Sequence, residues 1–405
     1  MAERVDVAVV GGGIVGLATA TEIARRRPEL RLAVVEKEAA IGCHQTGHNS
    51  GVVHSGVFYA PGSRKAALTL RGRAALLAYC ARERLPVGPI GKLVVAPTPA
   101  AVPALDRIAA RARANGVAGV VRRSPQELAE RLPGLRAAAA LDVPSAAIVD
   151  FRAVARRLAE GLARRGGEIR LGVRVEGAAR APDGWRLSTS EGEIAAGLVV
   201  NCAGLGSDLL ARSMGAAPGV RIVPFRGDFY ELNGPTRLAV RTLVYPVPDP
   251  RFPFAGVHLT PTVDGRLLAG PNAALALARE GYARGAVETA EVARLLTHPE
   301  PWRLLRRAPG AAAREWLRSW SPAEFLAAIR TLWPSAAPEE LGARRSGVRA
   351  QAVRPDGTLE EDFVLVRAPG ALHVVNAPSP AATASFAIAE EIVGAAGLAG
   401  RGPAG

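Results

Sequence analysis

A glycine motif near the N-terminus constrains the fold of this chain more than any other feature. Residues 5–10 (VDVAVV) are a β-branched run of the length of a buried parallel strand, and they lead into GGGIVG at residues 11–16, which has the spacing GxGxxG. Gly11 permits a tight turn, Gly13 lets the backbone approach a pyrophosphate, and Gly16 allows a helix to pack closely on the strand. The apolar spacing of LATATEIARRR predicts that helix, whose first N–H groups would face the phosphates.

The segment after this helix completes a βαβ unit. LAVVE reads as a second strand that ends at Glu36, twenty residues after Gly16. An acidic side chain at that point accepts hydrogen bonds from the ribose hydroxyls of an adenosine. A glycine-rich turn without a ligand is the alternative interpretation of the glycines, but the strand, helix, second strand and glutamate together favour a bound dinucleotide.

The loop that follows indicates which dinucleotide. Residues 41–63 (IGCHQTGHNSGVVHSGVFYAPGS) are rich in Gly, Ser, Thr, Asn and His and show little hydrophobic periodicity, so we expect a loop with many hydrogen-bond donors. An NAD-binding Rossmann domain usually continues from its second strand to another simple helix. A donor-rich loop instead suits a larger anionic cofactor whose ring is held deep in the protein.

Several of these segments resemble one family. GGGIVGLATA, EKE, CHQTGHNSGVVHSGVFY and the later NAPSPAATAS are similar to the L-2-hydroxyglutarate dehydrogenase/oxidase family, which belongs with glycine oxidase, sarcosine oxidase and glycerol-3-phosphate dehydrogenase to the D-amino-acid-oxidase-like FAD superfamily. The resemblance covers nearly the whole chain and is weakest at residues 100–145 and 280–340. It implies FAD as cofactor and oxidation of L-2-hydroxyglutarate to 2-oxoglutarate by hydride transfer to flavin N5, with electrons passing to a quinone, another carrier or oxygen.

The motif and the resemblance together predict a set of FAD-contacting residues from separated stretches of the chain. The set is Gly11, Gly13, Ile14, Val15, Gly16, Glu36, Lys37, Thr46, His48, Asn49, Ser50, Gly51, Val175, Ala203, Gly204, Pro378, Ser379, Pro380, Ala381 and Ala382. The resemblance implies that Val175 places its backbone against the adenine ring, and an ordinary buried valine is the alternative. It also implies that a helix starting near Ala381 faces the pyrimidine side of the flavin, where its dipole would stabilise negative charge.

The order of the segments predicts the domain organisation. IVPFRGDFYEL and LVYPVPDPRFPFAGVHLTPTVDGRLLAGPNA alternate β-branched and aromatic residues with Pro, Asp and Gly turns, which predicts an antiparallel sheet over the flavin. We therefore expect an α/β protein, with a discontinuous Rossmann-like FAD-binding domain and an α+β substrate domain built on a mostly antiparallel sheet. The expected FAD-binding parts are residues 1–90, 145–222 and 343–405. The expected substrate parts are residues 91–144 and 223–342, the second with a helical cap.

Oxidation of a 2-hydroxy acid needs a base for the hydroxyl proton, with a pKa near the working pH. Histidine meets that requirement, and the sequence has only six. His54 precedes two small residues in the donor-rich loop, and His258 lies on a predicted strand of the substrate domain. We predict that one of these two is the base, and the alternative for each is a hydrogen bond to backbone or to an FAD phosphate.

A dicarboxylate substrate also needs cationic partners, and arginine binds carboxylates in bidentate geometry. Arg226, Arg251 and Arg349 stand in recognisable segments, and we predict Arg226 as the principal carboxylate ligand. Tyr245 could donate a hydrogen bond to a carboxylate or orient the hydroxyl. The expected substrate is thus a small anionic 2-hydroxy dicarboxylic acid.

The charge and the cysteine pattern exclude several other kinds of binding function and structure. The formal net charge is +14, but only three lysines occur and the arginines are spread along the chain, so we expect no nucleic-acid binding. The positive field would still attract anionic substrates and lipid headgroups. The three cysteines show no metal spacing, and His44 and His48 are four positions apart but separated by residues that argue against a helix, so we expect no metal, no disulfide framework and a reducing compartment. No apolar stretch could span a bilayer, which predicts a cytoplasmic protein, and the positive charge permits a peripheral position on the inner face of the cell membrane.

Two other functions stay open at this point. The first is a superfamily relative that oxidises an amine, such as a D-amino acid, glycine or sarcosine. The second is a flavin- or NAD-binding module without turnover. The electron acceptor, the oligomeric state and covalent attachment of FAD are not predicted by the sequence.

Overall fold

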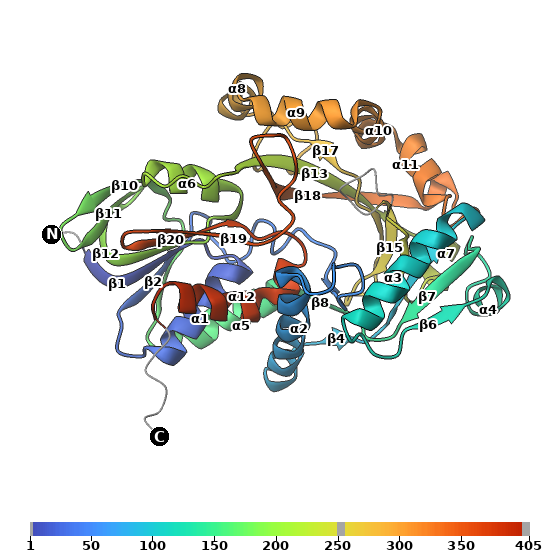
Figure 1. Cartoon of the computed structure of the whole chain (residues 1–405), viewed down its shortest axis with the longest axis horizontal. Coiled ribbons are helices and arrows are strands. Elements are labelled where there is room, and N and C mark those ends of the chain that lie inside the picture. Colours follow the sequence, from blue (N-terminus) through green and yellow to red (C-terminus); the bar gives the residue numbers. More distant parts are fainter. Residues whose placement is uncertain (1–2, 249–255, 399–405) are drawn as a thin grey trace.

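The computed structural model describes residues 3–248 and 256–398. Two large sheets stand next to each other and are joined by long strands (Figure 1). Arg251, one of the arginine candidates, lies outside the described residues. Among the described residues, no helix has the length and apolar character needed to cross a membrane.

In the part of the chain that the structure describes, the first sheet has eight strands, with the order β10-β11-β12-β1-β2-β9 and β20 and β19 added beside β12. Its strands are β1 (Glu3–Val10), β2 (Leu32–Val35), β9 (Glu168–Arg170), β10 (Val175–Ala181), β11 (Gly184–Thr189), β12 (Gly192–Asn201), β19 (Val364–Ala368) and β20 (Ala371–Asn376). β1 pairs in parallel with both β2 and β12, β2 with β9, and β12 with β20. This is the central part of a Rossmann-like sheet, to which β10 and β11 add an antiparallel edge.

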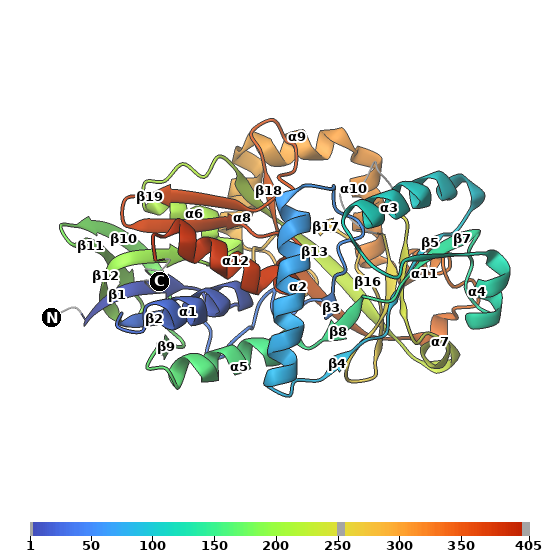
Figure 2. The same cartoon turned by 60° about the horizontal axis from the view of Figure 1, so that its bottom comes forward.

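Helices cover both faces of this sheet. α1 (Ile14–Arg26) lies between α5 (Phe151–Ala163) and α12 (Ala381–Ala395), and α2 (Arg64–Arg82) packs on α12 (Figure 2). α6 (Ser207–Ser213) contacts β10, β12 and β20. The largest apolar core lies between α1, α5, α12 and the sheet, because the strands at the centre of a parallel sheet are apolar on both faces.

Within the described residues the second sheet has nine strands, with the order β17-β13-β16-β15-β14-β5-β7-β6 and β18 beside β13. Its strands are β5 (Lys92–Ala96), β6 (Val121–Arg123), β7 (Ala139–Val143), β13 (Arg221–Leu232), β14 (Leu243–Pro246), β15 (His258–Pro261), β16 (Leu267–Gly270), β17 (Ala274–Leu275) and β18 (Leu341–Val353). All neighbouring strands are antiparallel except β5 and β14. The expected fold class is therefore confirmed: a Rossmann-like sheet with helices, and a mostly antiparallel second sheet.

Helices also flank the second sheet. They are α3 (Val102–Ala114), α4 (Pro125–Arg131), α7 (Gly234–Ala239), α8 (Thr289–Thr297), α9 (Pro299–Arg307), α10 (Pro309–Trp320) and α11 (Pro322–Ile329), with short 3-10 turns η1 (Pro99–Ala101), η2 (Gly204–Gly206) and η3 (Pro338–Glu340). α8 to α11 form the orange row above β13 and β18 in Figure 1. This row is where the sequence predicts a helical cap.

Two features connect the halves. β13 and β18 pair along most of their length, from Arg221 opposite Val353 to Leu232 opposite Leu341. A small sheet of β3 (Val52–Val53), β8 (Ala147–Val149) and β4 (Val87–Gly88) holds the end of the donor-rich loop. β18 runs across residue 342, where we placed a domain boundary, and it belongs by its pairing to the second sheet. The five-segment division itself remains a proposal.

Candidate functional site

One cavity of about 1000 Å³ runs from the carboxyl ends of the parallel strands to the second sheet. That volume is at the upper end of the range for cofactor and ligand sites. Its wall includes the ends of β1, β2 and β20, the first turns of α1 and α12, and residues of β13, β14, β15 and β18. Ligands of open parallel sheets bind at this edge, because the loops after the strands diverge there.

The glycine motif shapes the first part of the cavity. Gly11 has φ +113°, and a Cβ there would lie 2.4 Å from the carbonyl oxygen of Cys202. A Cβ on Gly16 would lie 2.0 Å from the Gly11 carbonyl oxygen, so β1 and α1 meet without room for a side chain. A Cβ on Gly13 would touch only the Thr46 hydroxyl at 3.4 Å, which leaves the Gly13 backbone open toward the cavity.

The first turn of α1 supplies donors at this point. Val15 and Gly16 line the cavity, and N–H groups of a first helical turn have no acceptor within the helix. The Ile14 N–H donates to the Thr46 hydroxyl at 3.0 Å, and Gly13, the N-cap, provides no side chain. The positive end of the helix dipole adds to these donors, so the turn fits a pyrophosphate.

Glu36 is held at the wall beside this turn. It is 7% exposed, and its two carboxylate oxygens accept from the Gly12 N–H at 2.6 Å and the Glu38 N–H at 2.9 Å. A carboxylate has about four acceptor positions, so positions remain for two hydroxyls of a ribose. Val175, at the start of β10, lines the same part of the cavity.

The donor-rich loop is fastened largely by its own side chains. The Asn49 amide donates to the carbonyl oxygens of Gln45 and Thr46 and accepts from the Gly51 N–H at 2.8 Å. The His48 ring lies 2.8 Å from the Ser346 carbonyl oxygen. These two side chains therefore position the loop, although both residues also line the cavity. Gly51 does not line it: Gly51 has φ +70°, and a Cβ there would lie 2.8 Å from the Val149 carbonyl oxygen.

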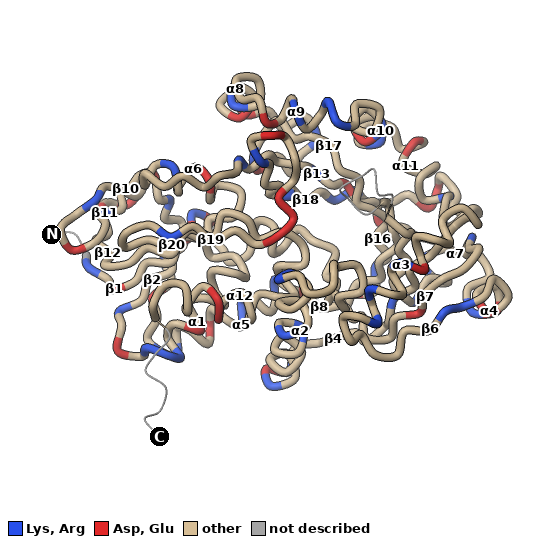
Figure 3. Tube along the Cα trace, viewed as in Figure 1, with Lys and Arg blue, Asp and Glu red and all other residues tan. Residues whose placement is uncertain are grey.

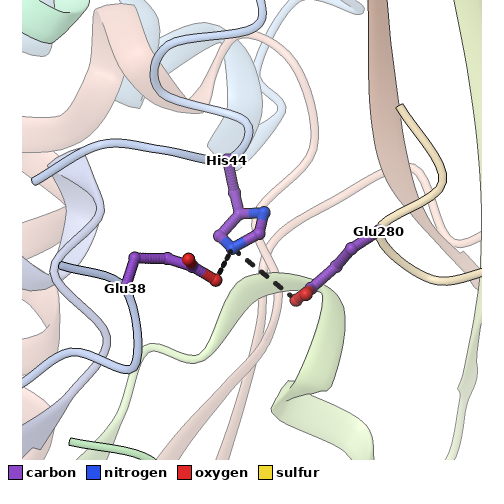
Figure 4. A group of neighbouring side chains, drawn as sticks. All are labelled: Glu38, His44 and Glu280. Atoms are coloured by element: carbon purple, nitrogen blue, oxygen red, sulfur yellow. Dashed lines mark hydrogen bonds and ion pairs between the residues drawn. The ribbon is translucent and has the colours of Figure 1, made fainter. Parts of the chain in front are cut away.

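An ion-pair group joins the loop to the segment before α8. The His44 Nε2 lies 2.9 Å from the Glu38 carboxylate and 3.8 Å from that of Glu280 (Figure 4). This arrangement has the residue types of a metal site, but the ammonium of Lys37 also pairs with both carboxylates. Because Lys37 bridges the two carboxylates, the group is accounted for as an ionic contact between two segments. Hydrogen bonding to His44 lowers the pKa of Glu38.

The C-terminal turn and α12 form the opposite wall. Pro378 to Thr383 line the cavity, and the N-cap, Pro380, makes no side-chain cap bond. The Thr383 hydroxyl accepts from the His54 N–H at 3.1 Å, which ties the donor-rich loop to the helix. The first turn of a 15-residue helix thus points into the cavity with its N–H groups and positive dipole end. The glycine cradle, Glu36 and this second helix end fit FAD.

Three aromatic side chains form the far end of the cavity. The Tyr245 and His258 rings stack with centroids 3.8 Å apart and an interplanar angle of 12°, and His54 lines the same wall. Burial lowers the pKa of His258 well below its ordinary value, and the charges of Lys92 and Arg349 lower it further. Burial and then Lys92 lower the pKa of His54 in the same way. Both imidazoles are therefore neutral near pH 7, whereas burial raises the pKa of Tyr245 to about 12 and keeps its hydroxyl protonated.

One of the arginine candidates, Arg349, lines the cavity, whereas Arg226, the predicted principal carboxylate ligand, does not. Arg349 on β18 lines the cavity, and burial lowers its pKa only to about 10, so it keeps its charge. Arg226 does not line it: its side chain lies 3.3 Å from the Asp228 carboxylate and donates to the Ala283 carbonyl oxygen. Side chains alternate along a strand, and on β13 Gly227 and Phe229 face the cavity. Arg226 therefore faces the other side.

Among the described residues, all the sequence-predicted ones other than Arg226 and Gly51 line this one cavity, and Arg251 lies outside the described ranges. Direct contact of each with a ligand remains a proposal. The sequence interpretation missed Lys65 and Arg279, which also line it, and Lys92, which lies behind the wall. For Lys92 a signal was present: it is one of only three lysines and directly precedes the apolar run LVVA.

The fold and the cavity define a flavin-dependent oxidoreductase. A model of the FAD dependent oxidoreductase (DAO) family matches residues 6–395, so the chain belongs to this family and its cofactor is FAD. The solved structure of FAD-bound L-α-glycerophosphate oxidase from Mycoplasma pneumoniae has the same fold, with a TM-score of 0.79, 21% identity, and coverage of 99% of this chain and 97% of that one. Glycine oxidase from Geobacillus kaustophilus matches with a TM-score of 0.74, 22% identity, and coverage of 99% and 96%.

More similar relatives identify the branch. The L-2-hydroxyglutarate dehydrogenase of Indibacter alkaliphilus is 40% identical, over 95% of this chain and 96% of the relative. The enzyme of that name from Escherichia coli K12 is 38% identical over 96% and 92%, and the human mitochondrial one is 38% identical over 95% and 86%. Within its class the chain belongs to the L-2-hydroxyglutarate dehydrogenase family, as the sequence segments indicated.

Proposed function

We propose that this chain oxidises L-2-hydroxyglutarate to 2-oxoglutarate. The observation that carries the proposal is the set of groups at the far end of the cavity: two neutral imidazoles, a protonated phenol and a charged arginine. These groups suit a substrate that brings both a hydroxyl to be deprotonated and negative charge to be bound. The names and identities of the relatives support the same substrate.

Each group has a distinct part in this reaction. Arg349 would bind a substrate carboxylate, since guanidinium and carboxylate form bidentate, charge-assisted hydrogen bonds. His54 or His258 would accept the proton of the C2 hydroxyl, and the Tyr245 hydroxyl would donate a hydrogen bond that orients the substrate. When bound, FAD supplies the two-electron acceptor for the hydride that leaves C2. Burial of this end excludes water, which strengthens these interactions.

The test is anaerobic reduction of the purified flavoprotein. We expect L-2-hydroxyglutarate to bleach the flavin absorption band, and its D enantiomer, glycine, sarcosine and D-amino acids to leave it unchanged. Bleaching by the amines alone would replace this proposal with amine oxidation. A colourless protein whose stability rises only with NAD would refute both.

We further propose that the electrons pass to a membrane quinone, with another carrier or oxygen as alternatives, and that the protein works peripherally at the inner face of the cell membrane. An exposed face of α9 and α10 supports this. Trp302, Trp316 and Trp320 are 46%, 57% and 42% exposed there, and Leu317 is 45% exposed. Tryptophan is typical of membrane interfaces, and cationic side chains bind anionic headgroups.

The charge on this face of α9 and α10 also supports the membrane proposal. Exposed arginines stand on α9 and α10, including Arg306, Arg307 and Arg314, while other basic residues are scattered over the chain (Figure 3). Co-sedimentation with vesicles that contain phosphatidylglycerol tests the surface. We expect Trp316→Ser with Trp320→Ser to reduce binding to anionic vesicles, with neutral vesicles and an exposed control, Leu238→Ser, for comparison. Equal sedimentation of the variant and the unchanged protein would contradict the membrane proposal.

A further inference from the structure

Lys92 is a buried cation that the proposed reaction does not yet use. It is the first residue of β5, its side chain is fully buried, and its Nζ has no hydrogen-bond partner among the described residues. Lysine is almost never fully buried unless it is paired. Removing an ammonium from water costs free energy, and without a hydrogen bond or ion pair that cost is not offset. Its position therefore calls for an explanation.

Sheet pairing places Lys92 next to the far end of the cavity. β14 lies between β5 and β15, so Tyr245 on β14 has Lys92 on one flanking strand and His258 on the other. The Lys92 Nζ lies 4.2 Å from the centroid of the Tyr245 ring, which itself stacks on the His258 ring at 3.8 Å. Lys92 is not part of the cavity wall. It reaches the substrate end only through its neighbours.

The surroundings of Lys92 hold bases and aromatic rings. The centroid of the Phe58 ring lies 5.4 Å from the Lys92 Nζ, and Tyr245, His258 and His54 are titratable groups near it. The carboxylate on the adjacent strand β7, Asp142, stands opposite Leu93, the neighbour of Lys92, and pairs with Arg123 and Arg131. Burial lowers the pKa of Lys92 to about 7. Below that pH the positive charge in the group of Lys92, Tyr245, His258 and His54 lies on Lys92.

We propose that Lys92 is a positioning residue for substrate oxidation: its buried ammonium adds to the effect of burial in keeping His54 and His258 uncharged, so that the histidine that acts as base can accept the substrate proton. Like charges in a poorly hydrated cluster repel, so a proton on Lys92 opposes a second proton on either imidazole. An anionic substrate would in turn stabilise the ammonium. The role as helper of a base rests on the proposed function, whereas the effect on the histidines does not.

The direct test is a histidine titration by NMR, which needs no substrate. The chain has only six histidines, so ring-labelled holoenzyme gives few signals, which His54→Gln and His258→Gln assign. Lys92→Met removes the charge and keeps the length and apolar stem of the side chain, and it leaves no buried group unpaired. We expect both histidines to titrate at higher pH in Lys92→Met. Unchanged titration of both would overturn the proposal.

Lys65→Met is a matched control, because the Lys65 charge acts on His54 but is not among the influences on His258. We expect Lys65→Met to move the titration of His54 alone. If it moved both histidines as far as Lys92→Met does, the effect would not be specific to Lys92, and the proposal would fail.

The pH dependence of flavin reduction by L-2-hydroxyglutarate then tests whether the charge of Lys92 affects the reaction. In Lys92→Met the acidic limb of the rate profile should move to higher pH, giving a loss of roughly fivefold at pH 6 and little loss at pH 9. A merely structural role would lower the rate equally at all pH values, which would refute the positioning role. Absence of reduction in the unchanged protein would refute the proposed substrate instead, and the NMR result would still stand.

Discussion

Arg279 is the residue whose replacement we expect to destabilise this protein most clearly. Its side chain is 7% exposed and donates to the Asp208 carboxylate at 2.7 Å and the Glu291 carboxylate at 2.8 Å. It also donates to the backbone oxygens of Leu205 and Ile222. Asp208 belongs to α6 and Glu291 to α8, so one guanidinium holds a helix of the first sheet to the helical row.

Arg279→Met should lower the free energy of unfolding by about 3–5 kcal/mol, the usual loss when one partner of a buried ion pair is removed. Most of this loss would come from Asp208, which is fully buried, because Arg294 still pairs with Glu291 at 2.7 Å. With an m value of about 3 kcal/mol per M, the urea midpoint should fall by roughly 1–1.7 M. Fluorescence of the five tryptophans reports this transition.

Two further variants test whether the loss of stability comes from the uncompensated buried charge or from any substitution at this contact. Arg294→Met removes a cation that is 28% exposed and should cost less than about 1 kcal/mol. Asp208→Asn and Glu291→Gln added to Arg279→Met should recover part of the stability, since no uncompensated charge remains. A loss below about 1 kcal/mol for Arg279→Met, or no recovery in the triple variant, would refute the reasoning.

The other predictions concern the cofactor site, the helices beside it and the buried bases. Gly16→Ala should abolish FAD absorbance in the purified protein, because the new Cβ would lie 2.0 Å from the Gly11 carbonyl oxygen. Gly72→Ala should cost about 1–3 kcal/mol in urea unfolding, since its Cβ would lie 2.5 Å from the Ala384 Cα, whereas Gly394→Ala, with nothing within 4 Å, should be neutral or stabilising. His54→Gln should keep the flavin spectrum and lose most substrate-driven flavin reduction; full reduction would remove His54 from the mechanism. Between pH 7 and 9 the unfolded chain keeps the proton of Lys92 and the folded chain releases it, because the folded pKa is about 7 and the ordinary value 10.5. Stability should therefore rise with pH by about 2–3 kcal/mol more in the unchanged protein than in Lys92→Met, and parallel curves would contradict this.

Local patterns predicted the cofactor site well. The glycine spacing, Glu36 and the Pro/Ser turn before α12 each depend on backbone geometry that a short segment encodes. Their residues line one cavity although they lie more than 300 positions apart, because β1, β12 and β20 pair in parallel and bring their carboxyl ends together.

The substrate end was less predictable, and β13 shows why. Nearly every residue of this strand is buried, so its sequence has no alternation that would reveal which side faces the cavity. The sequence therefore did not show that Arg226 faces away from the cavity while its neighbour Gly227 lines it. Lys92 was missed for a related reason: its neighbours Tyr245 and His258 come from strands about 150 residues later in the chain, and only the sheet order brings the three together.

The division of the cavity wall between the two ends of the chain has a consequence for biosynthesis. Gly11 and Thr383 line the same space, so a nascent chain cannot close the FAD site until nearly all of it has left the ribosome. Ligand binding stabilises only the state that holds the site, and this contribution is therefore absent throughout translation. The N-terminal βαβ unit can pack on α5 and β12 earlier, but the side of α1 that α12 covers stays exposed until the chain is almost complete, and this apolar surface favours aggregation and chaperone binding before release.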